Sequence, residues 1–150
     1  MTVGRVVAFD LGTKRIGVAV SDATATLASP RTTIERSGDG GRDRTRMAEL
    51  AREEGAALVL VGLPRNMDGS HGPAAAGASA EADALAPLLD VPVLLVDERL
   101  TTVTADRTLA ARGLRAPARR RVVDRTAAAV LLQAWLDGAA GAGWRAGRAP

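Results

Sequence analysis

Two continuous apolar runs, separated by one Ala-rich stretch, constrain the fold of this chain most strongly. The runs are ALVLVGL at 57–63 and VPVLLV at 91–96. Runs without polar alternation are typical of strands covered on both faces, as in parallel sheets. Residues 74–89, which lie between them, are rich in Ala and favour a helix. Because parallel strands need a crossover connection, this order predicts an α/β fold.

The first part of the chain predicts an antiparallel meander. Two β-branched runs, Val6–Phe9 and Ile16–Val20, flank a short polar link that contains Gly12, which is the pattern of a β-hairpin. Leu27–Ile34 is a plausible third strand. Pro30 within it cannot donate to a ladder, so we expect an edge strand or a bulge there.

The fold class predicted from these elements is α/β, with helices on both faces of a five-stranded mixed sheet. The sheet would combine the three-strand antiparallel meander with the two parallel strands. With 150 residues, the chain is most simply one domain, which we place at 1–137. Residues 138–150 are rich in Gly, Ala and Arg and are expected to form a disordered tail. Further helices are predicted at 42–54, 100–112 and 122–136.

Composition excludes several classes of protein. The chain has no cysteine, which excludes a disulfide framework and a thiolate metal site. No apolar run approaches the length of a membrane span, so we expect a soluble, cytoplasmic protein with no membrane partner. Basic side chains are concentrated late in the chain: residues 1–98 carry 10 basic and 14 acidic residues, whereas 99–150 carry 10 and 3. This asymmetry indicates a region that faces a polyanion.

Asp10 is the anomaly of the hairpin, because it places a carboxylate at the end of a core strand. A buried lone carboxylate must be paired, hydrated or bound to a metal. Asp97 and Glu98 end the second apolar run, and Asp124 opens the last predicted helix. If the first strand neighbours the parallel pair, acids from all three segments converge at one sheet edge. A cluster of ionised carboxylates would need hard cations, Mg²⁺ or Mn²⁺, and two such ions can clamp the oxygens of a phosphodiester displacement.

Each of these acids also has a structural interpretation. Asp124 alone is most simply a helix N-cap, and Asp97 alone is a solvated acid at a strand end. Because consecutive strand residues face opposite ways, Asp97 and Glu98 should not both enter one site unless the strand ends between them. Spacing alone does not choose between them.

Four blocks stand out in the sequence: DLGTKRIGVAVSD (10–22), VGLPRNMDGSHGP (61–73), DERLTT (97–102) and VDRTAAAVLLQ (123–133). In this order and spacing, they resemble the YqgF family, which is similar to RuvC-type Holliday junction resolvases and has an RNase H-like fold. The resemblance implies a nuclease in which Asp10, Glu98 and Asp124 are the catalytic, metal-binding carboxylates. It also favours Glu98 over Asp97. Family members are implicated in maturing the 5′ end of pre-16S ribosomal RNA, a step in ribosome biogenesis.

Several basic or polar residues near these acids are candidates for substrate binding. They lie in the hairpin turn, in the loop after the first apolar run, beside Glu98 and ahead of Asp124: Lys14, Arg15, Arg65, Asn66, Arg99, Arg119, Arg120 and Arg121. The alternative for the charges of the hairpin turn and of residues 115–121 is a solvated surface, and Arg99 could instead neutralise the acid cluster. His71, the only histidine, is expected to be a surface loop residue, because a metal-activated water would already supply the nucleophile.

Three other functions are compatible with parts of the sequence. An actin-like or sugar-kinase ATPase also begins with an Asp-x-Gly-Thr hairpin, but it needs two such domains. A Holliday junction resolvase acting on four-way DNA would need paired cuts and hence a dimer, and the sequence leaves monomer and homodimer open. A nucleic-acid-binding module without catalysis is the third alternative.

Overall fold

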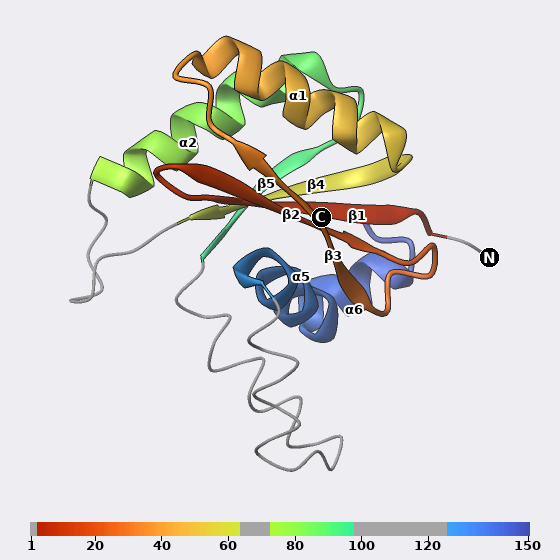
Figure 1. Ribbon diagram of the computed structural model, residues 1–150. Coiled ribbons are helices and arrows are strands. Elements are labelled where there is room, and N and C mark those ends of the chain that lie inside the picture. Colours follow the sequence, from red (N-terminus) through yellow and green to blue (C-terminus); the bar gives the residue numbers. More distant parts are fainter. Residues whose placement is uncertain (1–2, 64–72, 98–125) are drawn as a thin grey trace, which may run out of the picture.

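The computed structural model describes residues 3–63, 73–97 and 126–150. Three strands come first, and helices and strands then alternate as predicted (Figure 1); the helix predicted at 100–112 lies outside the described residues. The elements are β1 (Arg5–Leu11), β2 (Arg15–Ser21), β3 (Ala28–Glu35), α1 (Gly40–Glu53), β4 (Ala56–Leu63), α2 (Pro73–Leu85), the 3₁₀ helix η1 (Ala86–Leu88), β5 (Val93–Asp97), α5 (Ala127–Asp137) and α6 (Ala139–Arg145).

The five strands form one mixed sheet in the order β3-β2-β1-β4-β5. Strands β1, β2 and β3 pair antiparallel, whereas β4 is parallel to both β1 and β5. This arrangement confirms the predicted fold class. Because β1 is the central strand and has the same direction as β4 and β5, the carboxyl ends of these three strands meet at one edge of the sheet.

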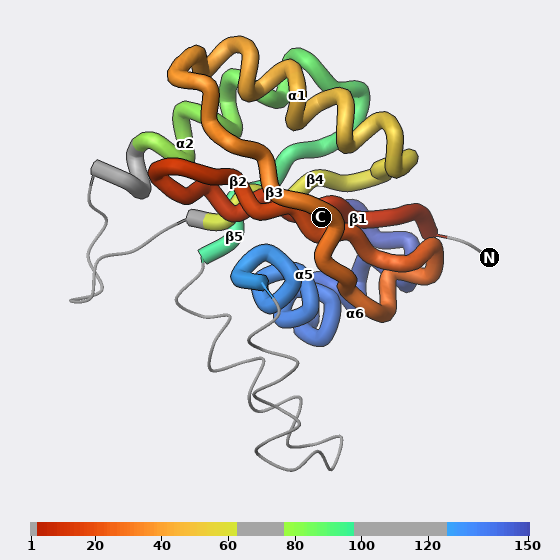
Figure 2. Tube along the Cα trace, viewed as in Figure 1, coloured from red at the N-terminus to blue at the C-terminus, as the bar shows by residue number. Residues whose placement is uncertain are grey.

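Helices cover both faces of the sheet. Figure 2 shows α1 and α2 on one side and α5 with α6 on the other. We call these sides the α1 face and the α5 face. Alternate residues of β1 point to opposite faces, as the pleat requires: Val7 and Phe9 belong to the cluster on the α1 face, and Val6 and Ala8 to the cluster on the α5 face.

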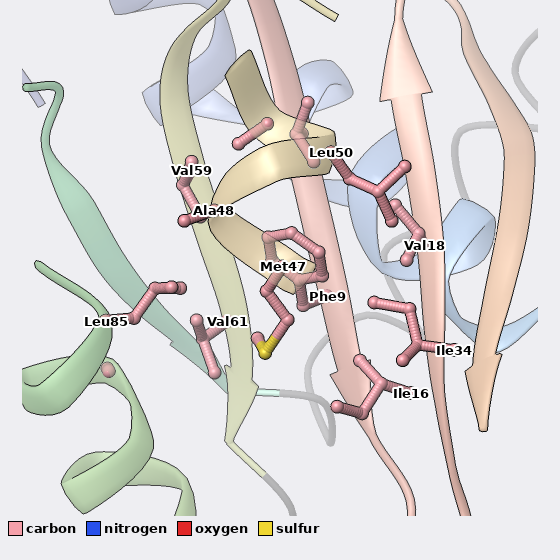
Figure 3. Close-up of a cluster of buried hydrophobic side chains, with 13 residues drawn as sticks. Phe9, Ile16, Val18, Ile34, Met47, Ala48, Leu50, Val59, Val61 and Leu85 are labelled. Atoms are coloured by element: carbon pink, nitrogen blue, oxygen red, sulfur yellow. The ribbon is translucent and has the colours of Figure 1, made fainter. Parts of the chain in front are cut away.

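The cluster on the α1 face joins the sheet to the amphipathic side of α1. Phe9 lies at its centre, against Met47 and between side chains of the neighbouring strands (Figure 3). Met47 and Leu50, three positions apart on α1, are both fully buried, as helical spacing predicts. Asp39 caps α1 by accepting a hydrogen bond from the amide of Arg42 at 3.2 Å.

Strand β3 confirms the expectation for Pro30. It is the edge strand beside β2, and the register with β2 shifts between Val18 and Ala19, where Pro30 pairs with Ala19. The opposite end of the meander is tied to α5: the Gln133 side chain accepts from the amide of Ala28 at 2.9 Å and donates to a carbonyl of the preceding loop at 3.0 Å.

The end of the chain differs from the predicted disordered tail. Residues 139–145 form α6, which packs on α5, and Trp144 joins the cluster on the α5 face. Arg145 fixes this turn, because its guanidinium donates to the carbonyls of Ala25 and Leu136, each at 2.8 Å. The Gly and Ala residues that suggested disorder are instead small residues that allow close packing.

Two other boundaries differ from the sequence-based expectation. Helix α5 begins at Ala127, with Thr126 as its N-cap, so the described helix is shorter than the predicted 122–136. Helix α2 ends at Leu85 and is followed by the short 3₁₀ helix. None of the helices in the described parts of the chain is long and apolar enough to cross a membrane.

Candidate active site at the carboxyl edge of the sheet

Asp10 lies near the carboxyl end of the central strand, on the α5 face. It follows Val6 and Ala8 at the two-residue period of the strand and pairs with Gly17 of β2. A Cβ atom placed on Gly17 would lie 3.7 Å from the Cβ of Asp10 and 3.5 Å from the Cβ of Ala128 on α5. On β2, the neighbour of Asp10 is therefore a glycine rather than a residue with a bulky side chain.

The Asp10 carboxylate is only partly exposed and is not neutralised by the described residues. Within residues 3–63, 73–97 and 126–150, no side chain or amide forms an ion pair or a hydrogen bond with it. A half-buried carboxylate without a partner is stabilised by water or by a cation. Its oxygens are hard ligands of the kind that Mg²⁺ and Mn²⁺ prefer.

Asp97 ends β5 at the same edge of the sheet but belongs to the other face. It pairs with Leu63, the last residue of β4. In β5, Leu94 and Val96 pack into the cluster on the α5 face, whereas Val93 packs on the α1 face. Alternation therefore assigns Asp97 to the α1 face, away from Asp10. Strand alternation therefore favours an arrangement in which Asp97 does not face Asp10.

The turn between β1 and β2 carries the two basic residues predicted to contact substrate. The Gly12 amide donates to the Arg15 carbonyl at 2.9 Å and closes the turn. Lys14 is exposed and forms no ion pair with any residue that the structure describes. Arg15 instead pairs with Glu35 of β3 at 2.9 Å, and both side chains are largely exposed. Lys14 is thus the available cation of this turn, and Arg15 is already partnered.

The other predicted site residues lie outside the described residues. These are Glu98 and Asp124 among the acids, and Arg65, Asn66, Arg99, Arg119, Arg120 and Arg121 among the substrate-binding candidates, together with His71. No cluster of three or more His, Cys, Asp or Glu side chains occurs among the residues that are described. Of the predicted acids, the structure therefore locates Asp10 alone.

Two residues that contact Asp10 or the hairpin turn after it were not predicted to matter for the site. Gly17 was considered only as a glycine that relieves crowding in a strand, but its register partner is Asp10. Arg36, directly after β3, donates from Nε to the Gly12 carbonyl at 2.7 Å. The predicted meander could have indicated Arg36, because the end of the third strand in a meander lies beside the turn that joins the first two strands.

Comparison with known proteins places the chain in one family. The family model described as "RuvX: Holliday junction resolvase" matches residues 4–138. A protein of Mycobacterium sp. (strain KMS), named "Putative pre-16S rRNA nuclease", is 45% identical over 135 residues, which cover 89% of this chain and 80% of the relative. A protein of the same name from Roseiflexus sp. (strain RS-1) is 44% identical over 134 residues, which cover 89% of this chain and 94% of the relative.

Solved structures share the fold at low sequence identity. The RuvC structure of Thermus thermophilus superposes with a TM-score of 0.53 and 19% identity, over 92% of this chain and 95% of that protein. RuvC of the same organism in complex with a Holliday junction substrate gives a TM-score of 0.50 and 17% identity, over 89% of this chain and 93% of that protein. These likenesses confirm the RNase H-like fold.

The family match covers nearly the whole described sheet and includes Asp10 at its central strand. The sequence-based resemblance is thereby confirmed. The chain belongs to the RuvX (YqgF) family, whose members are nucleases and resolvases that hydrolyse phosphodiester bonds.

Proposed function

We propose that this chain is a divalent-metal-dependent nuclease that processes the 5′ end of pre-16S ribosomal RNA. The observation that carries the proposal is Asp10: a half-buried carboxylate at the carboxyl end of the central strand, without a partner among the described residues. Ligands of open α/β sheets gather at this edge. Support for the RNA substrate comes from the name that relatives 44–45% identical to this chain carry.

Asp10, Glu98 and Asp124 are the acids that we propose to hold the metal. Glu98 directly follows Asp97, which alternation assigns to the α1 face. A residue one position later in an extended chain would be on the α5 face, the face of Asp10. Asp124 precedes the N-cap of α5 by two residues, and α5 packs on that same face. That β5 ends at the same sheet edge as Asp10, and that α5 packs on the face of Asp10, supports this assignment.

The proposed donor set fits Mg²⁺ or Mn²⁺. All three side chains are carboxylates, which are the ligands that these ions prefer, and Gly17, the register partner of Asp10, adds no side chain beside it. With substrate bound, these carboxylates would hold two such ions, which would supply Lewis-acid activation of water and stabilisation of the leaving oxygen. The role of the protein is to fix the carboxylates and to orient the phosphate.

Basic residues would orient that phosphate. Lys14 is the strongest described candidate, because it is exposed in the turn that follows Asp10 and has no ion-pair partner in the described chain. Arg15 would have to leave Glu35 to contribute.

We also assign phosphate contacts to the candidates outside the described residues, Arg65, Asn66, Arg99, Arg119, Arg120 and Arg121. Neutralising residues 119–121 should flatten the salt dependence of RNA binding, and an unchanged slope would remove them from the interface.

The decisive experiment compares Asp10→Asn with wild type on a pre-16S RNA fragment in Mg²⁺. Asn keeps the shape of the side chain but removes its charge, so cleavage should fall at least 10–100-fold, about the loss seen even for groups that only orient a metal ligand. Asp83→Asn is the matched control, because Asp83 is exposed on α2. Equal cleavage by both variants would refute the assignment of Asp10.

A four-way DNA junction belongs in the same assay. The family description and the RuvC complex make junction cleavage the second candidate activity. Faster cutting of the junction than of the RNA, with the same dependence on Asp10, would favour resolvase activity. Tight binding of either substrate with no cleavage by wild type would instead identify a binding module without catalysis.

A further inference from the structure

Arg36 connects the hairpin turn to the rest of the molecule. Its backbone amide donates to the Lys14 carbonyl at 2.9 Å, and its Nε donates to the Gly12 carbonyl at 2.7 Å. One residue therefore binds the turn at two carbonyls, one on each side of Thr13. The bond from the guanidinium is charge-assisted, and such bonds are shorter and stronger than those between neutral groups.

The far end of the Arg36 side chain faces α2. Its Nη1 lies 3.9 Å from Glu81 Oε1, and Arg44 of α1 approaches the other carboxylate oxygen, Oε2, at 3.4 Å. All three side chains are at least 73% buried, with exposed fractions of 24%, 19% and 27% for Arg36, Glu81 and Arg44. These three charged side chains thus connect α1 and α2 to the turn between β1 and β2.

We propose that Arg36 is a positioning residue, which holds the Gly12–Arg15 turn so that Lys14 is presented to a nucleic-acid phosphate beside Asp10. The proposal rests on the function proposed above. It follows from the two contacts of Arg36 with the turn, because a turn fixed at Gly12 and Lys14 has few ways to reorient. Fixing a binding group before the ligand arrives lowers the cost of ordering it on binding.

An ordinary surface ion pair does not account for this arrangement. Arg15 and Glu35, two residues of the same hairpin region, form such a pair with side chains 66% and 73% exposed. Arg36 is far more buried, and its short contact is with a backbone carbonyl, whereas the distance to Glu81 is near the limit for an ion pair. The geometry therefore assigns Glu81 and Arg44 to orienting the Arg36 guanidinium and Arg36 to orienting the turn.

A double-mutant cycle between Arg36 and Lys14 tests the proposal. We would measure the affinity for the pre-16S RNA fragment in Ca²⁺, and KM and kcat in Mg²⁺, for Arg36→Gln, Lys14→Gln and the double variant. If Arg36 acts through Lys14, each single change should weaken binding about 10-fold, and the double change should be no more than about threefold worse than either. Arg36→Lys, which keeps one cationic donor, should restore part of the loss.

Arg46→Gln is the matched control. Arg46 is also an arginine with ion pairs, to Glu49 and Glu53, but it lies on the exposed side of α1 and does not contact the turn. The control should bind and cleave like wild type. Multiplicative effects of the Arg36 and Lys14 changes, or an Arg36→Gln variant indistinguishable from Arg46→Gln, would overturn the proposal.

Amide hydrogen exchange separates failure of this proposal from failure of the proposed function. The Gly12 amide is bonded to the Arg15 carbonyl inside the turn. It should exchange about 10-fold faster in Arg36→Gln than in Arg46→Gln, while amides of β4 keep their protection. If wild type neither binds nor cleaves the RNA, the proposed function fails and the presentation of Lys14 fails with it. If binding depends on Lys14 but Gly12 exchanges at the same rate in both arginine variants, the positioning role alone is refuted.

Discussion

Replacing Gly17 by Ala should raise the stability of the fold and lower its cleavage activity. Gly17 is the register partner of Asp10 and contributes the open space beside its carboxylate. The added Cβ would be 3.5 Å from Ala128 and 3.7 Å from Asp10, which is ordinary van der Waals contact. The fold can therefore accept the methyl group, which would occupy space that a metal ion or phosphate bound at Asp10 would need.

The magnitude follows from the same geometry. A glycine inside a strand costs roughly 0.5–1 kcal/mol relative to alanine, and no clash offsets that gain at this position. Gly17→Ala should thus raise the free energy of unfolding by about 0.5–1 kcal/mol, and the Tm by roughly 1–4 °C for a chain of this length. Cleavage in Mg²⁺ should fall about 10-fold, the equivalent of 1.4 kcal/mol of lost transition-state stabilisation.

Thermal denaturation by circular dichroism and single-turnover cleavage measure the two quantities. Gly12→Ala is the contrasting variant, because its Cβ would lie 2.5 Å from the Arg15 carbonyl oxygen, and the backbone of the turn would have to shift. It should lose both stability and activity. A Gly17→Ala protein that is less stable than wild type would refute the packing argument. One that is more stable and fully active would show that the space beside Asp10 is not used.

Three further outcomes are expected. Asp97→Asn should keep near wild-type cleavage while Glu98→Gln loses at least 10–100-fold, measured at equal RNA and Mg²⁺ concentrations; the reverse order would contradict the assignment of faces in β5. Gly141→Ala places a Cβ 2.1 Å from a carbonyl oxygen of α5 and should lower the free energy of unfolding by about 1–3 kcal/mol in urea titrations. Hydrogen bonds from the hydroxyl and amide of Ser37 hold the pKa of Asp43 below its usual value of 3.8, although burial opposes them. Asp43 therefore stabilises the fold fully above about pH 4 and less as the pH falls through its folded pKa. The difference in the free energy of unfolding between wild type and Asp43→Asn should stay constant above about pH 4 and narrow as the pH falls below it. A difference that does not narrow at lower pH would contradict the assignment.

Much of the fold could be predicted because its pattern is local. Continuous apolar runs identified β4 and β5, and the Ala-rich stretch between them identified α2. Pro30 correctly indicated an edge strand with a register shift. The prediction of a disordered tail at 138–150 was wrong for a physical reason. Composition cannot distinguish a flexible Gly/Ala segment from one whose small residues let α6 pack against α5.

The site was less predictable than the sheet. Asp10 could be recognised because a carboxylate interrupts an apolar strand, and the central place of that strand is confirmed. The contribution of Arg36 depends on how the third strand returns past the hairpin turn, a tertiary contact between residues 24 positions apart. The roles of Glu98, Asp124 and the basic candidates after residue 97 stay predictions, since those residues lie outside the described chain.

The register of the central hairpin couples the core of this protein to its candidate active site. Val6 and Ala8 are fully buried on the α5 face, and Phe9 is fully buried on the α1 face. A slip of one residue would exchange these faces and carry Asp10 to the α1 face, away from Gly17. Such a slip would move Phe9 out of its place on the α1 face, which costs free energy. The packing of Phe9 therefore also determines on which face the Asp10 carboxylate lies. It follows that substitutions in the core of β1 should alter cleavage through register as well as stability, even where they do not touch the acid.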